Sequence, residues 1–271
     1  MAAVQITEYT DPGCPFAFSA EPIRWRLKWL YGDQLEWHLR MVVLSESVDD
    51  YAEKGLTAEI LAGGTDRLAR EHGMPMDTRV KPRLWATAPA CRAVVAARTH
   101  APEQEWLLLR RLRVRNFEGQ LLDEPSTIAD AAVDVGLDPA ALASWMDQTD
   151  LSEDKAASRN PSPAALAQPH KLANWEGGMR YTCPSYEFGL SVPGFQPWAA
   201  YEVSLANVAP GLEKRDPPSD VTELLRWAGT PLASKEVAVV MDTDVQAARE
   251  ALGRVAVEHH VGADGFWSLR D

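Results

Sequence analysis

The sequence predicts an α/β fold that begins with a strand–helix–strand unit. Residues 4–9 are rich in β-branched side chains and alternate along the chain, which is typical of a short strand. Pro15 then opens a helix, because proline at the first helical position loses no hydrogen bond. Alternation returns from about residue 35 to 44. These observations predict two parallel strands joined by a helix.

The elements that follow are expected to be mainly helical. Pro22 lies inside the first helix and is expected to kink it or split it. A helical pattern runs from about residue 57 to 173, interrupted at 151–163, where a polar segment with two prolines predicts a surface loop or a helix break. Beyond it, extended segments are expected at 181–188 and 192–197, with a helix at 198–207.

The last 61 residues, 211–271, are expected to form a small module of their own. Three helices and a hairpin are predicted there, with the first helix closed by Gly229 and the second running from residue 231 to 241. This arrangement resembles a winged helix. A DNA reader would need a basic third helix and wing, but this segment has seven basic residues against eleven acidic ones. We therefore expect a protein-contacting module, or a cap packed on the rest of the chain.

Composition narrows the classes of partner and site. Lys plus Arg number 27 and Asp plus Glu number 39, so the net charge of −12 argues against nucleic acid or an anionic membrane as a partner. No membrane-spanning run and no secretory signal is apparent, so the cytoplasm is the expected compartment. The six histidines show no metal-ligand spacing, and three cysteines cannot build a disulfide framework.

Two cysteine-bearing segments carry a resemblance to a known family. The first is Asp11-Pro-Gly-Cys-Pro-Phe-Ala17, at the first strand–helix junction, and the second is Cys183-Pro184, ahead of a later strand. With the order of elements, they resemble the DsbA family of thiol–disulfide oxidoreductases, in its FrnE-like branch. The resemblance implies a thioredoxin fold over residues 1–210 with a helical insertion at about 56–175, followed by the module at 211–271.

Within this family, the chain is most similar to ClpXP adaptor proteins of the YjbH/SpxH type. The similarity runs from residue 4 to about 269, and the two ends of the chain carry it. The additional matching segments are Ser19-Ala-Glu-Pro22, Val192-Pro-Gly194, Ala233-Ser-Lys-Glu236 and Gly265-Phe-Trp267.

The resemblance implies that Cys14 is the nucleophile and that Pro184 is a cis-proline. A thiolate at a helix N-terminus is stabilised by free N–H groups and by the helix dipole, which lowers its pKa. We expect Cys14 to be exposed there as a redox-active cysteine. Pro15, Phe16, Ala17 and Pro184 are the implied substrate-binding residues.

Ala17 departs from the family pattern, because it stands where a second cysteine would resolve a mixed disulfide. Release must then come from an outside thiol or from Cys183, which the resemblance places facing Cys14. A bond between them would need Cα atoms within about 7 Å. The alternative is that Cys183 is only a small buried residue. Cys91, in an apolar helical stretch, is expected in the core.

Two functions of different classes remain open. The first is an oxidoreductase with one motif cysteine that acts on protein or low-molecular-weight mixed disulfides, with a low-molecular-weight thiol as co-substrate and no other cofactor. The second is a non-enzymatic adaptor with a degenerate redox site, which binds a protein client. A glutathione-transferase-like isomerase would need a serine in the motif, which this sequence lacks.

Overall fold

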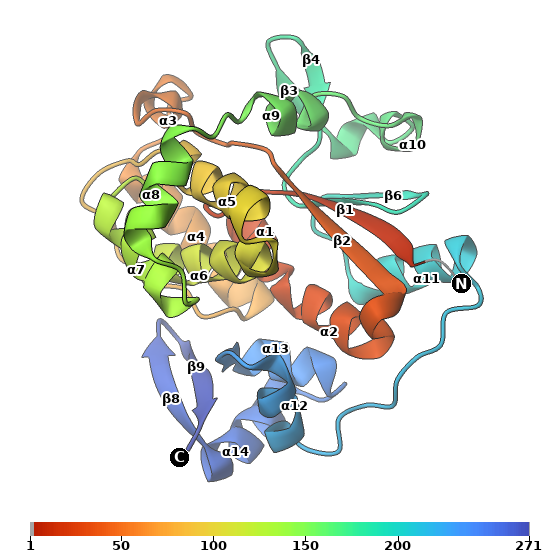
Figure 1. The fold of residues 1–271 in the computed structure, drawn as a ribbon. Helices are drawn as coiled ribbons and strands as arrows, with labels where there is room; N and C mark the ends of the chain where they lie inside the picture. The colour runs from red at the N-terminus through yellow and green to blue at the C-terminus, as the bar shows by residue number, and fades with distance from the viewer. Residues whose placement is uncertain (1–2, 271) are drawn as a thin grey trace.

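A four-stranded mixed sheet forms the centre of the computed structural model, which describes residues 3–270 (Figure 1). Its strand order is β2-β1-β5-β6, with β1 and β2 parallel and the other neighbours antiparallel. The predicted α/β class and parallel β1–β2 pair are confirmed. The strands are β1 (Val4–Thr10), β2 (Leu35–Met41), β5 (Ser185–Glu187) and β6 (Ser191–Pro193).

The register of this sheet brings distant segments of the chain together. Strand β1 pairs antiparallel with β5, and Tyr9 near the end of β1 lies opposite Ser185 at the start of β5. The segment that leaves β1 and the segment that enters β5 therefore meet at one edge of the sheet. Cys14 follows β1 and Cys183 precedes β5, so strand pairing alone places these two residues near one another.

The first helix is split, as Pro22 predicts. Helix α1 (Pro15–Ser19) ends one residue before α2 (Glu21–Tyr31), in which Pro22 occupies the first turn. Between β2 and the hairpin of β3 (Ala173–Trp175) and β4 (Gly178–Arg180) the chain is helical. Its α-helices are α3 (Asp49–Glu53), α4 (Ala58–His72), α5 (Ala88–His100), α6 (Glu105–Phe117), α7 (Pro125–Asp134), α8 (Pro139–Asp147), α9 (Ser152–Ser158) and α10 (Pro163–Leu166).

The prediction of a surface loop or helix break at 151–163 is partly wrong. The segment 151–163 contains helix α9, which is anchored by its buried Asp154. That carboxylate accepts a hydrogen bond of 2.7 Å from the backbone N–H of Met41 and pairs with Arg98 at 2.8 Å. Polar composition suggested a loop, but here a polar side chain ties a helix to the edge of the sheet.

The last part of the chain contains the three expected helices and the hairpin. They are α12 (Val221–Ala228), α13 (Ser234–Val240) and α14 (Val245–Val255), after α11 (Trp198–Val208), with β8 (Ala256–Val261) and β9 (Asp264–Leu269). The second helix begins at Ser234, not near residue 231, because Leu232–Ala233 forms strand β7 and pairs with β9.

These C-terminal elements share a hydrophobic core with helix α2. Trp25 and Trp29 of α2 are each 2% exposed and pack with Leu224, Val237 and Leu252. The segment between α11 and α12 also lies against α2, since the Trp29 indole donates a hydrogen bond to the Asp216 carbonyl at 2.8 Å. The C-terminal elements lie below α2 and α6 in Figure 1, so the region is packed as a cap on the rest of the chain.

A buried ionic network connects the sheet, two helices and this cap. Arg113 of α6 bonds to Glu8 of β1 and Glu21 of α2, and Arg110 pairs with Glu236 of α13 at 2.6 Å. Each of these side chains is at most 3% exposed. Because an unpaired buried charge is costly, this network stabilises one relative arrangement of the elements.

Within residues 3–270, no helix combines the length and the apolar character that crossing a membrane would require.

Candidate active site

The loop between β1 and α1 is held by one buried carboxylate. Asp11, which is 0% exposed, accepts hydrogen bonds from the N–H groups of Gly13 at 2.7 Å and Leu44 at 2.9 Å, and from the Thr87 hydroxyl at 2.8 Å. Glycine at position 13 allows this loop to pack closely against Thr87, because a Cβ there would lie 2.6 Å from the Thr87 methyl group. Asp11 thus fixes the backbone just before Cys14.

Cys14 is the N-cap residue of α1 and faces Cys183. Its Sγ lies 3.3 Å from the Cys183 carbonyl oxygen, across 169 residues of sequence. Ala17, at the position of the absent motif cysteine, packs with Val42 and the two cysteines in one buried cluster, the cysteine cluster. The Cys183–Pro184 peptide bond is cis, the isomer that the resemblance implies. The structure thus brings Cys14, Ala17 and Cys183 together.

The expected exposure of Cys14 is wrong: the residue is only 4% exposed. Ala17, Val42 and Cys183 cover the sulfur, and it reaches the exterior through a cavity that Pro15 and Phe16 also line. Phe16 is itself 38% exposed. The sequence could indicate the helix start but not the side chains that fold over it.

Two opposing effects act on the pKa of Cys14. Burial raises it, whereas hydrogen bonds from the Cys183 thiol and the Ala17 N–H lower it, and the result lies below the ordinary value of 9.0. The nearby Asp11 carboxylate opposes this lowering. Helix α1 has only five residues, so the free N–H groups rather than a long helix dipole favour the thiolate.

This shift predicts the pH dependence of alkylation. The rate of Cys14 modification by iodoacetamide is expected to rise with pH and to reach half its maximum below pH 9.0, because the thiolate is the reacting form. Cys183→Ala is expected to move this midpoint upward, since the variant loses the hydrogen bond from the second thiol. Mass spectrometry of the modified peptide measures both rates. A midpoint at or above pH 9 would contradict a stabilised thiolate.

The other two thiols are less acidic. Burial raises the pKa of Cys183 well above 9.0, and the neighbouring Cys14 raises it further. Cys91 is 0% exposed and hydrogen-bonds to Asp11 at 3.4 Å, so it lies in the core as predicted. Burial raises its pKa too.

A cavity of about 370 Å³ opens beside Cys14. Its walls come from α1, α3, α4 and α6 and from the segment between α4 and α5. Sequence reasoning missed its members, Tyr51, Lys81 and Trp85 among them, because no spacing rule connects them to the motif. Lys81 donates hydrogen bonds of 2.6 Å to Asn116 and to the Gln120 carbonyl, and burial lowers its pKa to about 7.

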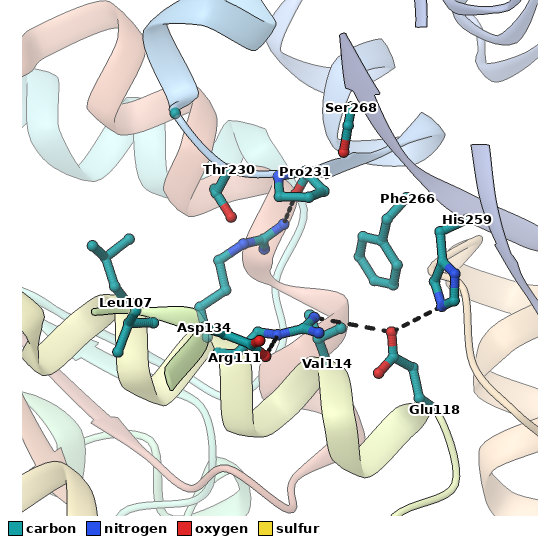
Figure 2. Close-up of a pocket in the computed structure, with 13 residues that line it drawn as sticks. Leu107, Arg111, Val114, Glu118, Asp134, Thr230, Pro231, His259, Phe266 and Ser268 are labelled. Atoms are coloured by element: carbon teal, nitrogen blue, oxygen red, sulfur yellow. Dashed lines mark hydrogen bonds and ion pairs between the residues drawn. The ribbon is translucent and has the colours of Figure 1, made fainter. Parts of the chain in front are cut away.

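A second cavity, of about 470 Å³, lies between α6 and the hairpin of β8 and β9 (Figure 2). No cysteine lines it. Glu118 points toward both Arg111 and His259, at 3.9 and 3.3 Å, and Arg111 also pairs with Asp134 (Figure 2). Arg111, Glu118, Asp134 and His259 are thus paired with one another, and Cys14 lines only the smaller of these two cavities.

No group of three or more His, Cys, Asp or Glu side chains suited to a metal ion occurs in the described part of the chain.

Solved structures show to which class this fold belongs. A chain from Streptomyces coelicolor described as a probable DsbA oxidoreductase matches with a TM-score of 0.55 and 16% identity, over 80% of this chain and 94% of that one. The cytosolic disulfide reductase DsbM from Pseudomonas aeruginosa, solved with GSH, matches with a TM-score of 0.54 and 17% identity, over 75% and 100%. A Nitrosomonas europaea chain, provisionally described as a protein disulfide isomerase, matches with a TM-score of 0.54 and 16% identity, over 76% of this chain and 97% of that one.

The chain therefore has the fold of DsbA-like, thioredoxin-fold proteins. The matched proteins are covered almost completely, whereas about a fifth to a quarter of this chain has no counterpart in them. No protein-family model matches the sequence, and no curated protein matches it.

Proposed function

We propose that this protein is a thiol–disulfide oxidoreductase of the DsbA family, in its FrnE-like branch, with Cys14 as nucleophile and Cys183 as internal resolving thiol. The observation that carries the proposal is the apposition of the two cysteines, with Cys14 Sγ 3.3 Å from the Cys183 carbonyl. Because the pKa of Cys14 is lowered and that of Cys183 is raised, Cys14 is the thiol that reacts first.

The first step is attack by the Cys14 thiolate on a mixed disulfide. A bond forms between Cys14 and one substrate sulfur, the substrate S–S bond breaks, and the other sulfur leaves as a thiolate. Cys14 then carries no negative charge, which removes one of the groups that hold the pKa of Cys183 high. Cys183 can lose its proton and attack Cys14 Sγ, which forms a Cys14–Cys183 disulfide and releases the second substrate thiolate.

Two equivalents of a low-molecular-weight thiol complete the cycle. The first attacks the Cys14–Cys183 disulfide and the second releases the resulting adduct, so the two thiols leave as one disulfide and both cysteines are reduced again. A disulfide reductase that was solved with GSH has the same fold, which supports a low-molecular-weight thiol as co-substrate. The reducing cytoplasm is the compartment that we propose.

Cys14→Ser tests the proposal directly. The variant is expected to lose reduction of a glutathione–peptide mixed disulfide, because a hydroxyl at this position is not ionised and cannot attack the substrate. The assay follows release of the peptide thiol by mass spectrometry. Cys91→Ser is the matched control and should keep the wild-type rate, since this residue lies in the core and serine keeps a hydrogen-bond donor to Asp11.

Cys183→Ala distinguishes the two thiols. This variant should still form the Cys14 adduct but should accumulate it, whereas the wild type should accumulate a Cys14–Cys183 disulfide. Unchanged turnover by Cys14→Ser would refute the oxidoreductase. An inert wild-type protein would instead favour the adaptor, whose client binding should survive Cys14→Ser.

A further inference from the structure

The cavity beside Cys14 has apolar walls and one basic side. Leu44, Leu61 and Trp85 are among the apolar residues that line it, and the Tyr51 ring packs edge-on against Trp85 at 6.2 Å. A volume of about 370 Å³ lies in the range of small-molecule sites and is too small for a folded protein segment. The cavity therefore suits an apolar group of small-molecule size next to the nucleophile.

The charges on the basic side favour an anion. Arg67, Arg79 and Lys81 line the cavity, and Asp77 is the one carboxylate among the lining residues. Asp77 is matched by Arg79 at 2.6 Å, and Arg67 reaches Glu71, outside the cavity, only at 4.0 Å. Lys81 has no carboxylate partner, because its hydrogen bonds go to Asn116 and to a backbone carbonyl. Because burial lowers the pKa of Lys81 to about 7, this group is only partly charged near neutral pH, but Arg67 and Arg79 against the single Asp77 still leave the lining with an excess of positive charge.

A glycine inside helix α4 keeps the cavity open. Gly64 lies within Ala58–His72, where glycine costs about 1 kcal/mol relative to alanine. A Cβ at this position would meet no atom within 4 Å, so no packing inside the chain requires glycine. Gly64 lines the cavity, and a larger residue would project into it. The helix is less stable here than alanine would make it, and the glycine lines the same cavity as Cys14.

From these observations we propose that the cavity binds the leaving half of a low-molecular-weight disulfide, an apolar group that bears a carboxylate or another anionic group. The inference rests on the proposed function of Cys14 and names its substrate class. The apolar part packs between α4 and Trp85, and the anionic group lies against Arg67, Arg79 and Lys81. When the thiolate of Cys14 attacks, the S–S bond breaks and the anionic thiolate leaves from the cavity, while Cys14 keeps the other half.

Two aromatic disulfides provide the test on the full-length protein. Dithiobis-nitrobenzoate bears a carboxylate on each ring, whereas dithiodipyridine is neutral, smaller, and also carries one aromatic ring on each sulfur. Experiments use the Cys183→Ala background, so that each measures only the reaction of Cys14, with Cys14→Ser as the blank. We expect Arg67→Gln combined with Arg79→Gln to slow the anionic reagent about tenfold and the neutral one less than twofold, a selectivity of at least about fivefold, or about 1 kcal/mol.

Filling the cavity should act on both reagents. Gly64→Leu is expected to slow both at least tenfold, because the side chain occupies the space that the aromatic ring would take. Gly63→Leu is the matched control. It lies in the same helix, is exposed, also has open space at its Cβ and does not line the cavity. Arg70→Gln, on the outer side of α4 and paired with Asp66, is the corresponding charge control.

Iodoacetamide separates failure of this inference from failure of the proposed function, because it is small, neutral and needs no cavity. No reaction of Cys14 with iodoacetamide would overturn the proposed function. Normal alkylation together with equal loss of both disulfide reactions in the arginine variant would overturn the anionic site. A cysteinyl-peptide disulfide that reacts faster than either aromatic reagent, and equally fast in Gly64→Leu, would place the substrate outside the cavity.

Discussion

Replacing Arg113 by methionine is expected to lower the free energy of unfolding by about 3–5 kcal/mol. The guanidinium is 1% exposed, donates a 3.1 Å hydrogen bond to Glu8, and also bonds to Glu21 and Thr10. Methionine has similar length but no charge, so the buried Glu8 and Glu21 would each lose a cationic partner. Urea denaturation followed by tryptophan fluorescence measures the change, and the ten tryptophans provide the signal.

Arg70→Met is the matched control for this experiment. Arg70 pairs with Asp66 one helical turn away, but its side chain is 69% exposed, and such pairs contribute at most about 0.5 kcal/mol. If the two variants lost similar free energy, the buried network would not hold the elements together. Because Arg113 lies outside the cysteine cluster, the folded fraction of the variant should still alkylate at Cys14.

The tip of the C-terminal hairpin provides the second large expected effect. Gly262→Ala should lower the free energy of unfolding by about 2–4 kcal/mol. Gly262 has a φ of +64°, where a side chain is strained, and a Cβ there would overlap the backbone carbonyl of Met76. Met76 is 1% exposed, so neither segment can move aside easily. Thermal unfolding by circular dichroism would detect the loss.

Gly253→Ala, also a glycine-to-alanine change, is expected to raise the free energy of unfolding instead of lowering it. Gly253 lies in helix α14, has no positive φ and would place its Cβ in open space. Alanine there should raise the free energy of unfolding by up to about 1 kcal/mol through helix propensity. Equal effects at positions 253 and 262 would show that the hairpin tip does not press against Met76.

The sequence was informative where local chemistry determines structure. Pro22 predicted the break between α1 and α2, and Gly229 directly follows α12, where its capping property places it. The start of α13 was predicted too early, because the short strand β7 forms only through pairing with β9. Strand pairs between distant segments have no local signal when each strand has two or three residues.

The proximity of Cys14 and Cys183 was predicted, whereas the side chains that surround them were not. The motif residues identified Cys14 and Cys183, but the burial of Cys14 depends on Val42 and on the cavity walls from α3 and α4. Arg110 and Arg113 belong to a helix rich in charged residues, a pattern typical of a solvated face. Their partners Glu8 and Glu236 come from opposite ends of the chain, so only the folded structure reveals that these arginines are buried.

If Cys14 and Cys183 form the proposed disulfide, the pairing of Tyr9 with Ser185 makes that bond a reporter of the assembly of β1 with β5. Cys14 and Cys183 are 169 residues apart, so in an unfolded chain a bond between them would have to close a very long loop. They meet only after β5, among the last strands of the central sheet to be synthesised, has paired with β1. An incomplete chain would therefore lack the second thiol and could not store an oxidising equivalent within itself. The proposed disulfide would therefore be expected only in chains in which β1 and β5 are paired.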